Sequence, residues 1–545
     1  MAVYSGDAVV DGSRDAEKYS GGDLKKDASI TEDTVPRVSK PLMTMFNAGA
    51  VVAVVVASIE AVVPMSFFVQ AVGPWGVETS SLWMLAAYLI GYVGFVLPTQ
   101  RLADVFGRLA VFWLGLVLFV VFSGVAAHAA SAYTFAVLRA FQGVGAGMVT
   151  SVGVQVAGAH ASERSRGLLV AALAAAQLFG IGAAHAIGGR LAVDGRFRWG
   201  VYLAAPLAAL PAVLCTPALV QDLRRRPRTE SLAQRVRAFD AVGTLLLLGA
   251  AVMLTSGLTF GGNEHKWNTA IVLCLIIFGA VSAGLFLAWE AVGASRPVFN
   301  PSWLRERNLQ ISMLAVLFLS MAFFANAAYV PIMYITVRHA DSAAAGRMTA
   351  PYWGASMCAA VLAGSVLRVR PSLARLVVWA GLAVAAVFSG LYYTIEMEPA
   401  SLAKERAFYA LAGVGIGLAY PAVIFIAQTS VPRDESRSAA AVAHFLSIVG
   451  GMLGLILYQA CLKSRLIVNL SPLFSQSKFL ASFDIRTMDI AGLEISGGTV
   501  TSYAPDLAPK IGAGMMVALH TTFILSVPLL GAALVATLLY KRSSH

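Results

Sequence analysis

Charged residues are scarce in this chain of 545 residues. Asp, Glu, Lys and Arg make up 13% of it and 58% is hydrophobic, so the mean hydropathy is +0.74. A string of soluble domains of this length would need far more polar surface, and the composition predicts a polytopic membrane protein instead. The net charge of +11 is spread over short segments between apolar runs, which argues against nucleic-acid binding.

Cysteine is also rare, and the residue patterns of common enzymes are missing. The four cysteines have no metal-ligand spacing and are expected to act as small buried hydrophobic residues: Cys215, Cys274, Cys358 and Cys461. The chain has no Gly-x-x-x-x-Gly-Lys-Ser/Thr phosphate loop, no Ser/His/Asp order and no His/Cys cluster. We therefore expect neither an enzyme nor an ATP-driven pump, and no cofactor or metal.

The apolar runs predict an all-α membrane protein. Residues 1–41 are polar and mixed in charge, so they are expected to form a disordered tail. They do not resemble a cleavable signal peptide. Fourteen runs follow, each close to the ~20 residues that a helix needs to cross a bilayer. They are 45–72, 82–100, 109–129, 132–157, 167–189, 199–221, 240–261, 269–290, 310–335, 348–367, 375–394, 407–430, 439–461 and 514–540.

The basic residues predict the orientation of these helices. If the N-terminus lies inside, the short inner segments hold twenty Lys and Arg residues and the outer ones eight. Because positive charge collects on the cytoplasmic side, both termini are expected in the cytoplasm. One connection, 463–513, is long and would lie outside; it carries Asn469 in an Asn-Leu-Ser sequon, a candidate for glycosylation that Pro472 disfavours.

The connection between the second and third runs, PTQRLADVFGRLA, resembles a signature of the major facilitator superfamily. The matching residues are Leu102, Ala103, Asp104, Gly107 and Arg108, while Gln100 replaces a leading glycine. An Asp and an Arg at a helix end can form charge-assisted bonds to a neighbouring helix. Such bonds would latch one side of the protein in one state and break in the other. An ordinary charge pair in an inner loop is the alternative.

The fourth run, YTFAVLRAFQGVGAGMVTSVG, resembles the next motif of the superfamily through Arg139, Gln142, Gly143, Gly145 and Gly147. An arginine inside the membrane is costly, so it should face a cavity and have a partner. Glu60 in the first run is the acidic residue nearest in depth. We therefore predict an Arg139–Glu60 pair, with a water-filled vestibule around Glu60 as the alternative.

The fifth run contains GIGAAHAIGG, residues 180–189, which resembles the antiporter motif of exporters through Gly180, Gly188 and Gly189. Small residues at this spacing let helices approach closely. His185 stands where that motif has proline. It either bonds a backbone carbonyl or a water, or it is a titratable switch, since its unperturbed pKa of about 6.5 lies within reach of an acidic exterior.

The resemblance covers about residues 42–540 and is strongest to fourteen-span drug:proton antiporters. It implies two six-helix bundles with two additional linking helices and a substrate site near the midplane. The boundaries are then 1–41 for the tail, 42–221 for the first bundle, 222–298 for the linking part, 299–540 for the second bundle, and 541–545 for a cytoplasmic end.

The chain departs from that family at the coupling residues. Val54 and Val55 stand where an Asp is usual in the first span, Thr336 replaces a Gln, and Ser447 replaces a frequent basic residue. If proton coupling exists, it must use Glu60, His185 or both.

The resemblance and the residues together predict a transporter for a small organic compound. Few fixed charges are available to the substrate cavity, which favours an amphipathic or neutral compound or a weak acid. Candidate cavity residues are Gln155, Gln177, Asn326, Tyr329, Tyr334, Tyr352, Trp353, Tyr420 and Gln428, although each is more often a packing residue. We expect proton-driven efflux of a toxin, drug or secondary metabolite by a plasma-membrane monomer. The alternatives are a proton-coupled importer of a nutrient or iron-chelate, a non-transporting sensor, and a vacuolar or vesicle membrane.

Overall fold

The computed structural model describes residues 39–72, 81–160, 163–194, 196–225, 234–235, 239–261, 265–292, 303, 305–396, 401–432, 435–474 and 508–541. Within these ranges the chain is helical apart from short connections and one isolated bridge between Gly261 and His265. The all-α prediction is therefore confirmed. The predicted tail, 1–41, falls almost wholly outside the described residues.

The helices follow the apolar runs. They are α2 (Lys40–Val72), α3 (Ser81–Val96), α4 (Pro98–Phe106), α5 (Arg108–Ala126), α6 (Ala132–His160), α7 (Glu163–Val193), α8 (Phe197–Tyr202), α9 (Ala204–Arg225), α11 (Ala241–Phe260), α12 (Ala270–Val292), α13 (Arg307–Arg338), α14 (Ser342–Val369), α15 (Ala374–Gly390), α16 (Leu402–Thr429), α17 (Ser436–Phe474), α19 (Ala508–Phe523) and α20 (Ser526–Leu538). Thirteen stretches of the described chain are long and apolar enough to span a membrane, and the shorter apolar part of α3 fills the remaining predicted range. Each of the fourteen predicted spans thus coincides with one helix or with two consecutive helices.

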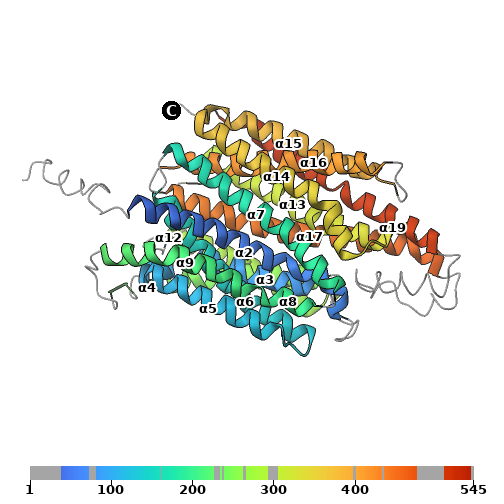
Figure 1. Ribbon diagram of the computed structural model, residues 1–545, viewed down its shortest axis with the longest axis horizontal. Helices are drawn as coiled ribbons and strands as arrows, with labels where there is room; N and C mark the ends of the chain where they lie inside the picture. The colour runs from blue at the N-terminus through green and yellow to red at the C-terminus, as the bar shows by residue number, and fades with distance from the viewer. Residues whose placement is uncertain are drawn as a thin grey trace, which may run out of the picture.

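Two groups of roughly antiparallel helices lie side by side. Helices α2, α3, α5, α6 and α9 form the lower group in Figure 1, and α13, α15, α16 and α20 lie in the upper group. We call the lower set the first group and the upper set the second group. Helix α7 packs on α2 and belongs to the first group, and α14 and α17 pack on α16 and α13 and belong to the second. The groups meet where α7 packs along α14 and where α17 touches α3. We call the end where α2, α7, α13 and α17 begin the arginine-rich end, after Arg101, Arg108, Arg305 and Arg307.

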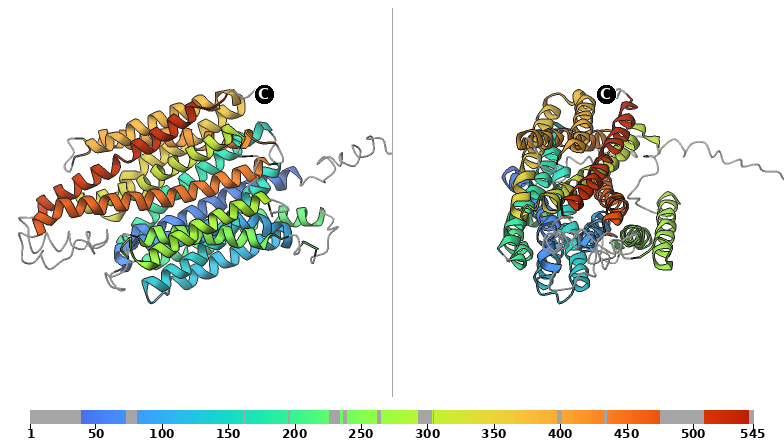
Figure 2. Two further views of the ribbon diagram at one scale, coloured as in Figure 1. Left: turned by 180° about the vertical axis from the view of Figure 1, so that it is seen from behind. Right: turned by 90° about the vertical axis from the view of Figure 1, so that its right-hand side faces the viewer.

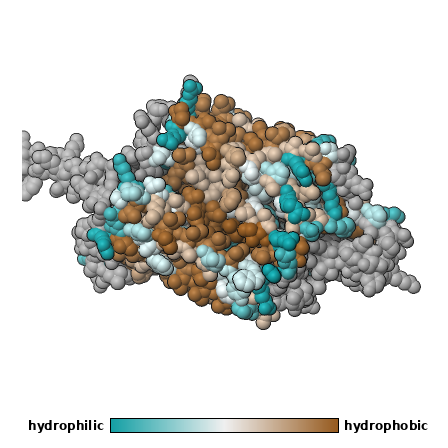
Figure 3. All heavy atoms as spheres, viewed as in Figure 1, coloured by the Kyte–Doolittle hydropathy of each residue, from teal (hydrophilic) through white to brown (hydrophobic). Residues whose placement is uncertain are grey.

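The two linking helices stay at the edge of the molecule. Helix α11 packs on α12 and also on α3 and α17, one helix from each group. Helix α12 stands apart from the groups in the end-on view of Figure 2, and only 17% of its apolar 18-residue stretch is buried inside the protein. Its remaining apolar surface is available to lipid. Figure 3 shows the same distribution, with hydrophobic residues over the middle of the visible face and hydrophilic ones mostly toward the ends.

Glycines set the close helix contacts in both groups. A Cβ at Gly145 of α6 would lie 2.5 Å from the Gly115 carbonyl oxygen of α5, and one at Gly415 of α16 would lie 2.6 Å from the Gly381 oxygen of α15. In lipid, helices associate through such close packing, since burial of apolar surface gives little driving force. The two groups therefore repeat one packing arrangement at Gly-x-Gly positions.

Several predicted boundaries and one predicted environment are wrong. The second span breaks at Leu97, because Pro98 lacks the N–H that would continue α3 and starts α4 instead. Helix α17 continues through the predicted loop start at residue 463 to Phe474, carried by apolar residues that pack against α19. Cys274 and Cys358 are exposed, since lipid-facing helix surfaces are as apolar as the core.

The candidate glycosylation site lies in this extended helix. Asn469 is part of α17, and its Nδ2 donates a hydrogen bond to the Gly514 carbonyl of α19 at 3.3 Å. A sequon in a regular helix with its amide nitrogen engaged is a poor acceptor site. The rest of the predicted outer connection, 475–507, lies outside the described residues.

Candidate functional site

The strongest candidate is a group of buried polar side chains inside the first helix group. Glu60 lies on α2, and Arg139 and Gln142 lie on α6; each is 0% exposed. Helix α6 approaches α3 closely at Gly147, where an added Cβ would lie 2.7 Å from the Tyr92 carbonyl oxygen. Gly143 and the Tyr88 carbonyl form a similar contact one turn earlier. The glycine motif therefore brings Arg139 against the neighbouring helices.

These side chains form one hydrogen-bonded network. Arg139 Nη1 lies 3.5 Å from Glu60 Oε2 and donates to Gln142 Oε1 at 2.7 Å. Gln142 Nε2 donates to Glu60 Oε2 at 3.0 Å, and Arg139 Nη2 donates to the Glu60 backbone carbonyl. The guanidinium carbon also lies 4.5 Å from the centroid of the Tyr88 ring. The structure thus brings together Arg139 and Glu60, with Gln142 as a bridge between them.

One oxygen of this network is left over. Glu60 Oε1 is buried and has no hydrogen-bond partner among the described residues. Burying a carboxylate oxygen that has no hydrogen-bond partner costs free energy. In a neutral carboxylic acid the same oxygen can carry a proton. The network can therefore exist with one more or one fewer proton, and each state changes the charge that faces Arg139.

The predicted latch residues lie at the arginine-rich end. Gly107 joins α4 to α5 with φ 96°, a backbone conformation that favours glycine. Arg108 Nη1 lies 3.5 Å from Asp222 Oδ2 of α9, so this pair stays within the first helix group. Asp104 is exposed at the end of α4.

The glycines of α7 form close contacts with helices of both groups. A Cβ at Gly180 would lie 2.7 Å from the Val55 carbonyl oxygen of α2, and one at Gly182 would lie 2.6 Å from Trp353 Cβ of α14. Gly189 approaches the Ser342 carbonyl of α14, and Gly188 is buried. The fifth span is thereby packed between the two groups.

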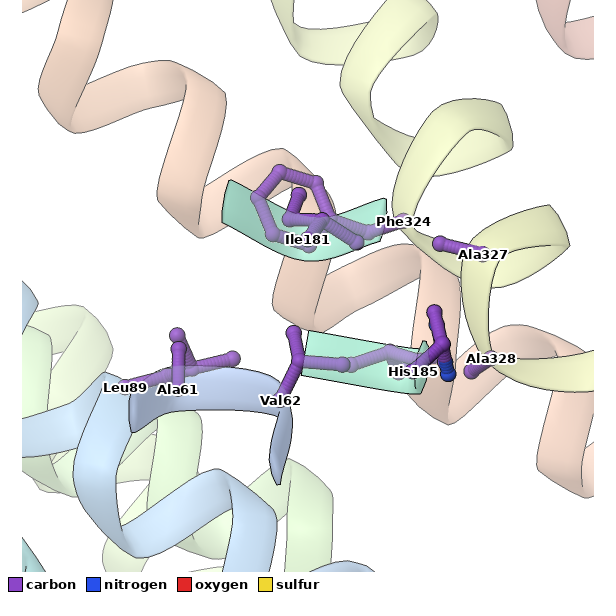
Figure 4. Close-up of a pocket in the computed structure, with 9 residues that line it drawn as sticks. Ala61, Val62, Leu89, Ile181, His185, Phe324, Ala327 and Ala328 are labelled. Atoms are coloured by element: carbon purple, nitrogen blue, oxygen red, sulfur yellow. The ribbon is translucent and has the colours of Figure 1, made fainter. Parts of the chain in front are cut away.

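His185 lies at this contact, in a small cavity between the groups (Figure 4). The cavity is lined by Ala61, Val62, Leu89, Ile181, His185, Phe324, Ala327, Ala328 and Leu455. The histidine ring stacks on Trp353 with ring centroids 5.7 Å apart, and its Nε2 has no hydrogen-bond partner among the described residues.

The remaining cavity candidates fall into separate places. Gln177 accepts a hydrogen bond of 3.2 Å from Tyr420 across the two groups, and Tyr352 packs on Trp353 beside His185. Asn326 and Tyr329 face the inside of the second group, where their partners are Ser526 and the Leu455 carbonyl. Gln155 bonds Ser151 of its own helix, and Gln428 is buried near the end of α16.

Sequence reasoning missed a second contact between the groups. His444 Nε2 of α17 lies 3.0 Å from Tyr92 Oη of α3, and that hydroxyl lies 2.8 Å from Thr150 Oγ1. A lone histidine in an apolar run carries no signal of its partner. Its single clue was that an ionisable residue inside a span is rare.

Sequence reasoning also missed a charge pair in the second group. Arg338 and Glu405 form two parallel bonds, Nη1–Oε2 at 2.8 Å and Nη2–Oε1 at 2.6 Å. Tyr334, a predicted cavity residue, instead donates to Glu405 Oε2 at 3.2 Å. The pair joins the last turn of α13 to the first turn of α16, and both side chains are largely buried.

Breaking this pair should destabilise the protein strongly. In Arg338→Met, Glu405 is left buried without its counter-charge, which costs about 3–5 kcal/mol. The double variant Arg338→Met/Glu405→Met should unfold closer to the wild type, because both charges are gone. The exposed pair of Arg190 and Asp194 supplies the control, and Arg190→Met should cost less than about 1 kcal/mol. Thermal unfolding in detergent gives the order; a single variant as stable as the wild type would refute it.

The described residues hold no group of three or more His, Cys, Asp or Glu side chains that could bind a metal ion. What the fold offers is buried polar and charged groups inside a helical membrane protein, on two helix groups that meet along α7 and α14. This arrangement of two helix groups with buried polar side chains is typical of membrane transporters.

The comparisons give the family. The chain belongs to the Major Facilitator Superfamily, whose family model matches residues 45–455. It is 25% identical to an MFS-type transporter of Metarhizium majus over 71% of this chain and 66% of that one. It is 21% identical to the multidrug transporter protein MdtP of Bacillus subtilis over 91% and 93%. It is 25% identical to the acurin A biosynthesis cluster MFS-type transporter of Aspergillus aculeatus over 78% and 74%.

The fold agrees with a solved structure. The crystal structure of a bacterial homolog of the human lysosomal transporter Spinster superposes with a TM-score of 0.60 at 15% identity, covering 92% of this chain and 98% of that one. The predicted class, a multi-pass major facilitator transporter, is therefore confirmed.

Proposed function

We propose that this transporter exports a neutral or amphipathic organic compound in exchange for protons, and that Glu60 carries the proton. The observation that carries the proposal is the buried network of Glu60, Arg139 and Gln142, in which one carboxylate oxygen has no partner. No other acidic residue lies in the first span. A proton arriving at Glu60 would neutralise it and weaken its attraction to Arg139.

Alternating access would use the contacts between the two groups. Tyr92–His444 and Tyr420–Gln177 join the groups by hydrogen bonds and must break when the groups part there. Close backbone contacts between α7 and α14, such as Gly189 with Ser342, must separate when they part at the opposite end. Loss of the proton at Glu60 would bias the protein toward one of these states through α2 and α6.

Export is favoured over import by two observations. The glycines of the antiporter-like segment pack α7 against both groups, and relatives of this chain include a multidrug transporter and a transporter of a biosynthesis cluster. We place the protein in the plasma membrane as a monomer, with the arginine-rich end and both termini in the cytoplasm. The six-helix bundles 42–221 and 299–540, with the linking part 222–298, then move as two halves.

A proton uncoupler tests the direction and the energy source together. Cells that express the protein are loaded with a panel of uncharged amphipathic dyes, and efflux is followed with and without uncoupler. The expected result is efflux above that of cells lacking the protein, and its loss when the proton gradient collapses. Proton-dependent uptake of the dyes would instead support an importer, and efflux that survives the uncoupler would refute proton coupling.

A further inference from the structure

The connection between α14 and α15 differs in charge from the others at the arginine-rich end. Its sequence, VLRVRPSLAR, holds Arg368, Arg370 and Arg375, and the chain has no Asp or Glu anywhere from residue 342 to residue 395. Each of the other helix connections at this end carries at least one carboxylate, from Asp104, Glu163, Asp222, Glu306 or Glu435. The α14–α15 connection therefore has positive charge without a nearby compensating acid.

The three arginines are also without partners in the fold. Arg368 and Arg370 are exposed and Arg375 is half-buried. None of these side chains forms an ion pair or a hydrogen bond with another described residue, whereas Arg108 at the same end has Asp222 at 3.5 Å. The backbone between them is short and ordered, since the Arg370 N–H bonds the Val366 carbonyl at 2.7 Å. Three guanidinium groups are thus held close together with their donors available.

Apolar side chains flank the arginines. Val369, between Arg368 and Arg370, is 76% exposed, and Leu376, after Arg375, is 58% exposed. Leu362 is also exposed and lies two turns before Val369 on the same face of α14. These residues continue the apolar surface that the second group presents to lipid, up to the point where the arginines begin.

A tryptophan and a further cation lie at the same place. Trp379, half-buried and one turn after Arg375, donates its Nε1–H to the Thr537 carbonyl of α20 at 3.1 Å. Tryptophan is enriched at the level of the lipid headgroups. Lys541 follows α20 and is exposed, and Figures 1 and 2 both show the C-terminus of the chain beside this end of the second group. The positive charge therefore stands at the border between apolar surface and water.

We propose that the α14–α15 connection is a binding site for an anionic phospholipid. Guanidinium groups form paired hydrogen bonds with phosphate oxygens, and the acyl chains would lie on the exposed apolar faces of α14 and α15. A zwitterionic lipid is disfavoured, because its ammonium group would face several cations and no carboxylate. The site lies on the outside of the second group, apart from the network of Glu60 and Arg139.

Native mass spectrometry of the delipidated full chain in detergent tests this site. The probes are dioleoylphosphatidylglycerol, dioleoylphosphatidylcholine and glycerol 3-phosphate; the two lipids share their acyl chains, and the third compound offers a phosphate without chains. The wild type should bind phosphatidylglycerol at least about tenfold more tightly than phosphatidylcholine, since each arginine near an anionic lipid contributes about fivefold. Glycerol 3-phosphate at an equal concentration should not displace phosphatidylglycerol.

Substitution by glutamine isolates the three arginines. Arg368→Gln/Arg370→Gln/Arg375→Gln should weaken phosphatidylglycerol binding roughly 10–100-fold, while unchanged phosphatidylcholine binding shows that the variant is folded. Arg370→Gln alone should weaken it about fivefold, which tests the site even if the triple variant does not fold.

A second triple variant is the matched control. Arg101→Gln/Arg305→Gln/Arg307→Gln removes the same number of charges from the same end, at connections that carry Asp104 and Glu306. It should keep the preference for phosphatidylglycerol.

Three results would overturn the assignment. Equal binding of the two lipids by the wild type would show that the connection does not select an anion. A preference that survives in the first triple variant, or that falls equally in the control, would show that the charge of the whole end attracts the lipid. Displacement by an equal concentration of glycerol 3-phosphate would show a site for free phosphate instead of a lipid.

Discussion

Proteoliposomes that contain Glu60→Gln should no longer build up a compound gradient from a pH gradient. One pH unit corresponds to about 1.4 kcal/mol, so one-for-one exchange can support a concentration ratio of about ten. Glutamine keeps the size of the side chain and can still accept from Gln142, but it cannot take up or lose a proton. The variant should therefore reach a ratio of about one, while compound-for-compound exchange, which needs no net proton movement, continues.

The control for this experiment is a carboxylate outside the network. Glu396 is exposed and uses its backbone carbonyl, not its side chain, to bond Arg338. Glu396→Gln should behave like the wild type. If Glu60→Gln still accumulates the compound about tenfold per pH unit, Glu60 does not carry the coupled proton, and the network is structural. Loss of exchange as well as accumulation would also contradict the account, since it would assign Glu60 to the movement of the compound itself.

Gly346→Leu should stop transport by preventing the two groups from closing at the end opposite the arginine-rich end. Gly346 lies on α14, and a Cβ there would be 2.7 Å from the His185 carbonyl oxygen of α7. Backbone cannot move aside without shifting a helix. Overpacking of this kind costs about 1–3 kcal/mol. Here it destabilises only the closed state, because the contact exists only in that state. The closed population should fall roughly 5–150-fold.

The same helix provides the matched control for this substitution. Gly354 has nothing within 4 Å of an added Cβ, so Gly354→Leu should transport normally. Spin labels at Arg190→Cys and Arg347→Cys, two exposed positions on α7 and α14, report the separation of the groups. Gly346→Leu should give only the longer distances. Normal transport, or an unchanged distance distribution, would show that this contact does not close the protein.

The predicted spans matched the helices because hydropathy is a local property. About twenty apolar residues in a row are enough to predict a membrane helix. The boundaries depended on more than hydropathy. Helix α17 extends to Phe474 because α19 packs against it, and no local pattern in 463–474 reports that neighbour.

The polar contacts also differ in whether the sequence could predict them. The Arg139–Glu60 contact could be predicted because an intramembrane arginine demands a partner and the first span offers one acid. Arg338 and Glu405 both lie outside the predicted spans 310–335 and 407–430, where a charge needs no partner, so nothing in the sequence linked them. The Tyr92–His444 bond joins residues 352 positions apart and depends on how the two groups meet.

The role of His185 changed most between sequence and structure. The sequence left a backbone bond and a titratable switch as alternatives. The structure places the ring against Trp353 with its Nε2 unpartnered in a small apolar cavity, an environment that the packing of α7 against α14 and α13 produces.

Proton movement driven by a gradient of the compound shows whether Glu60 couples proton transport to export. Proteoliposomes with a trapped pH-sensitive dye are given a tenfold gradient of the transported compound and no initial pH gradient. Protons should flow opposite to the compound, toward a limit of about one pH unit for one-for-one exchange, and no proton flow should occur with Glu60→Gln. No pH change in the wild type, or protons moving in the same direction as the compound, would contradict this coupling.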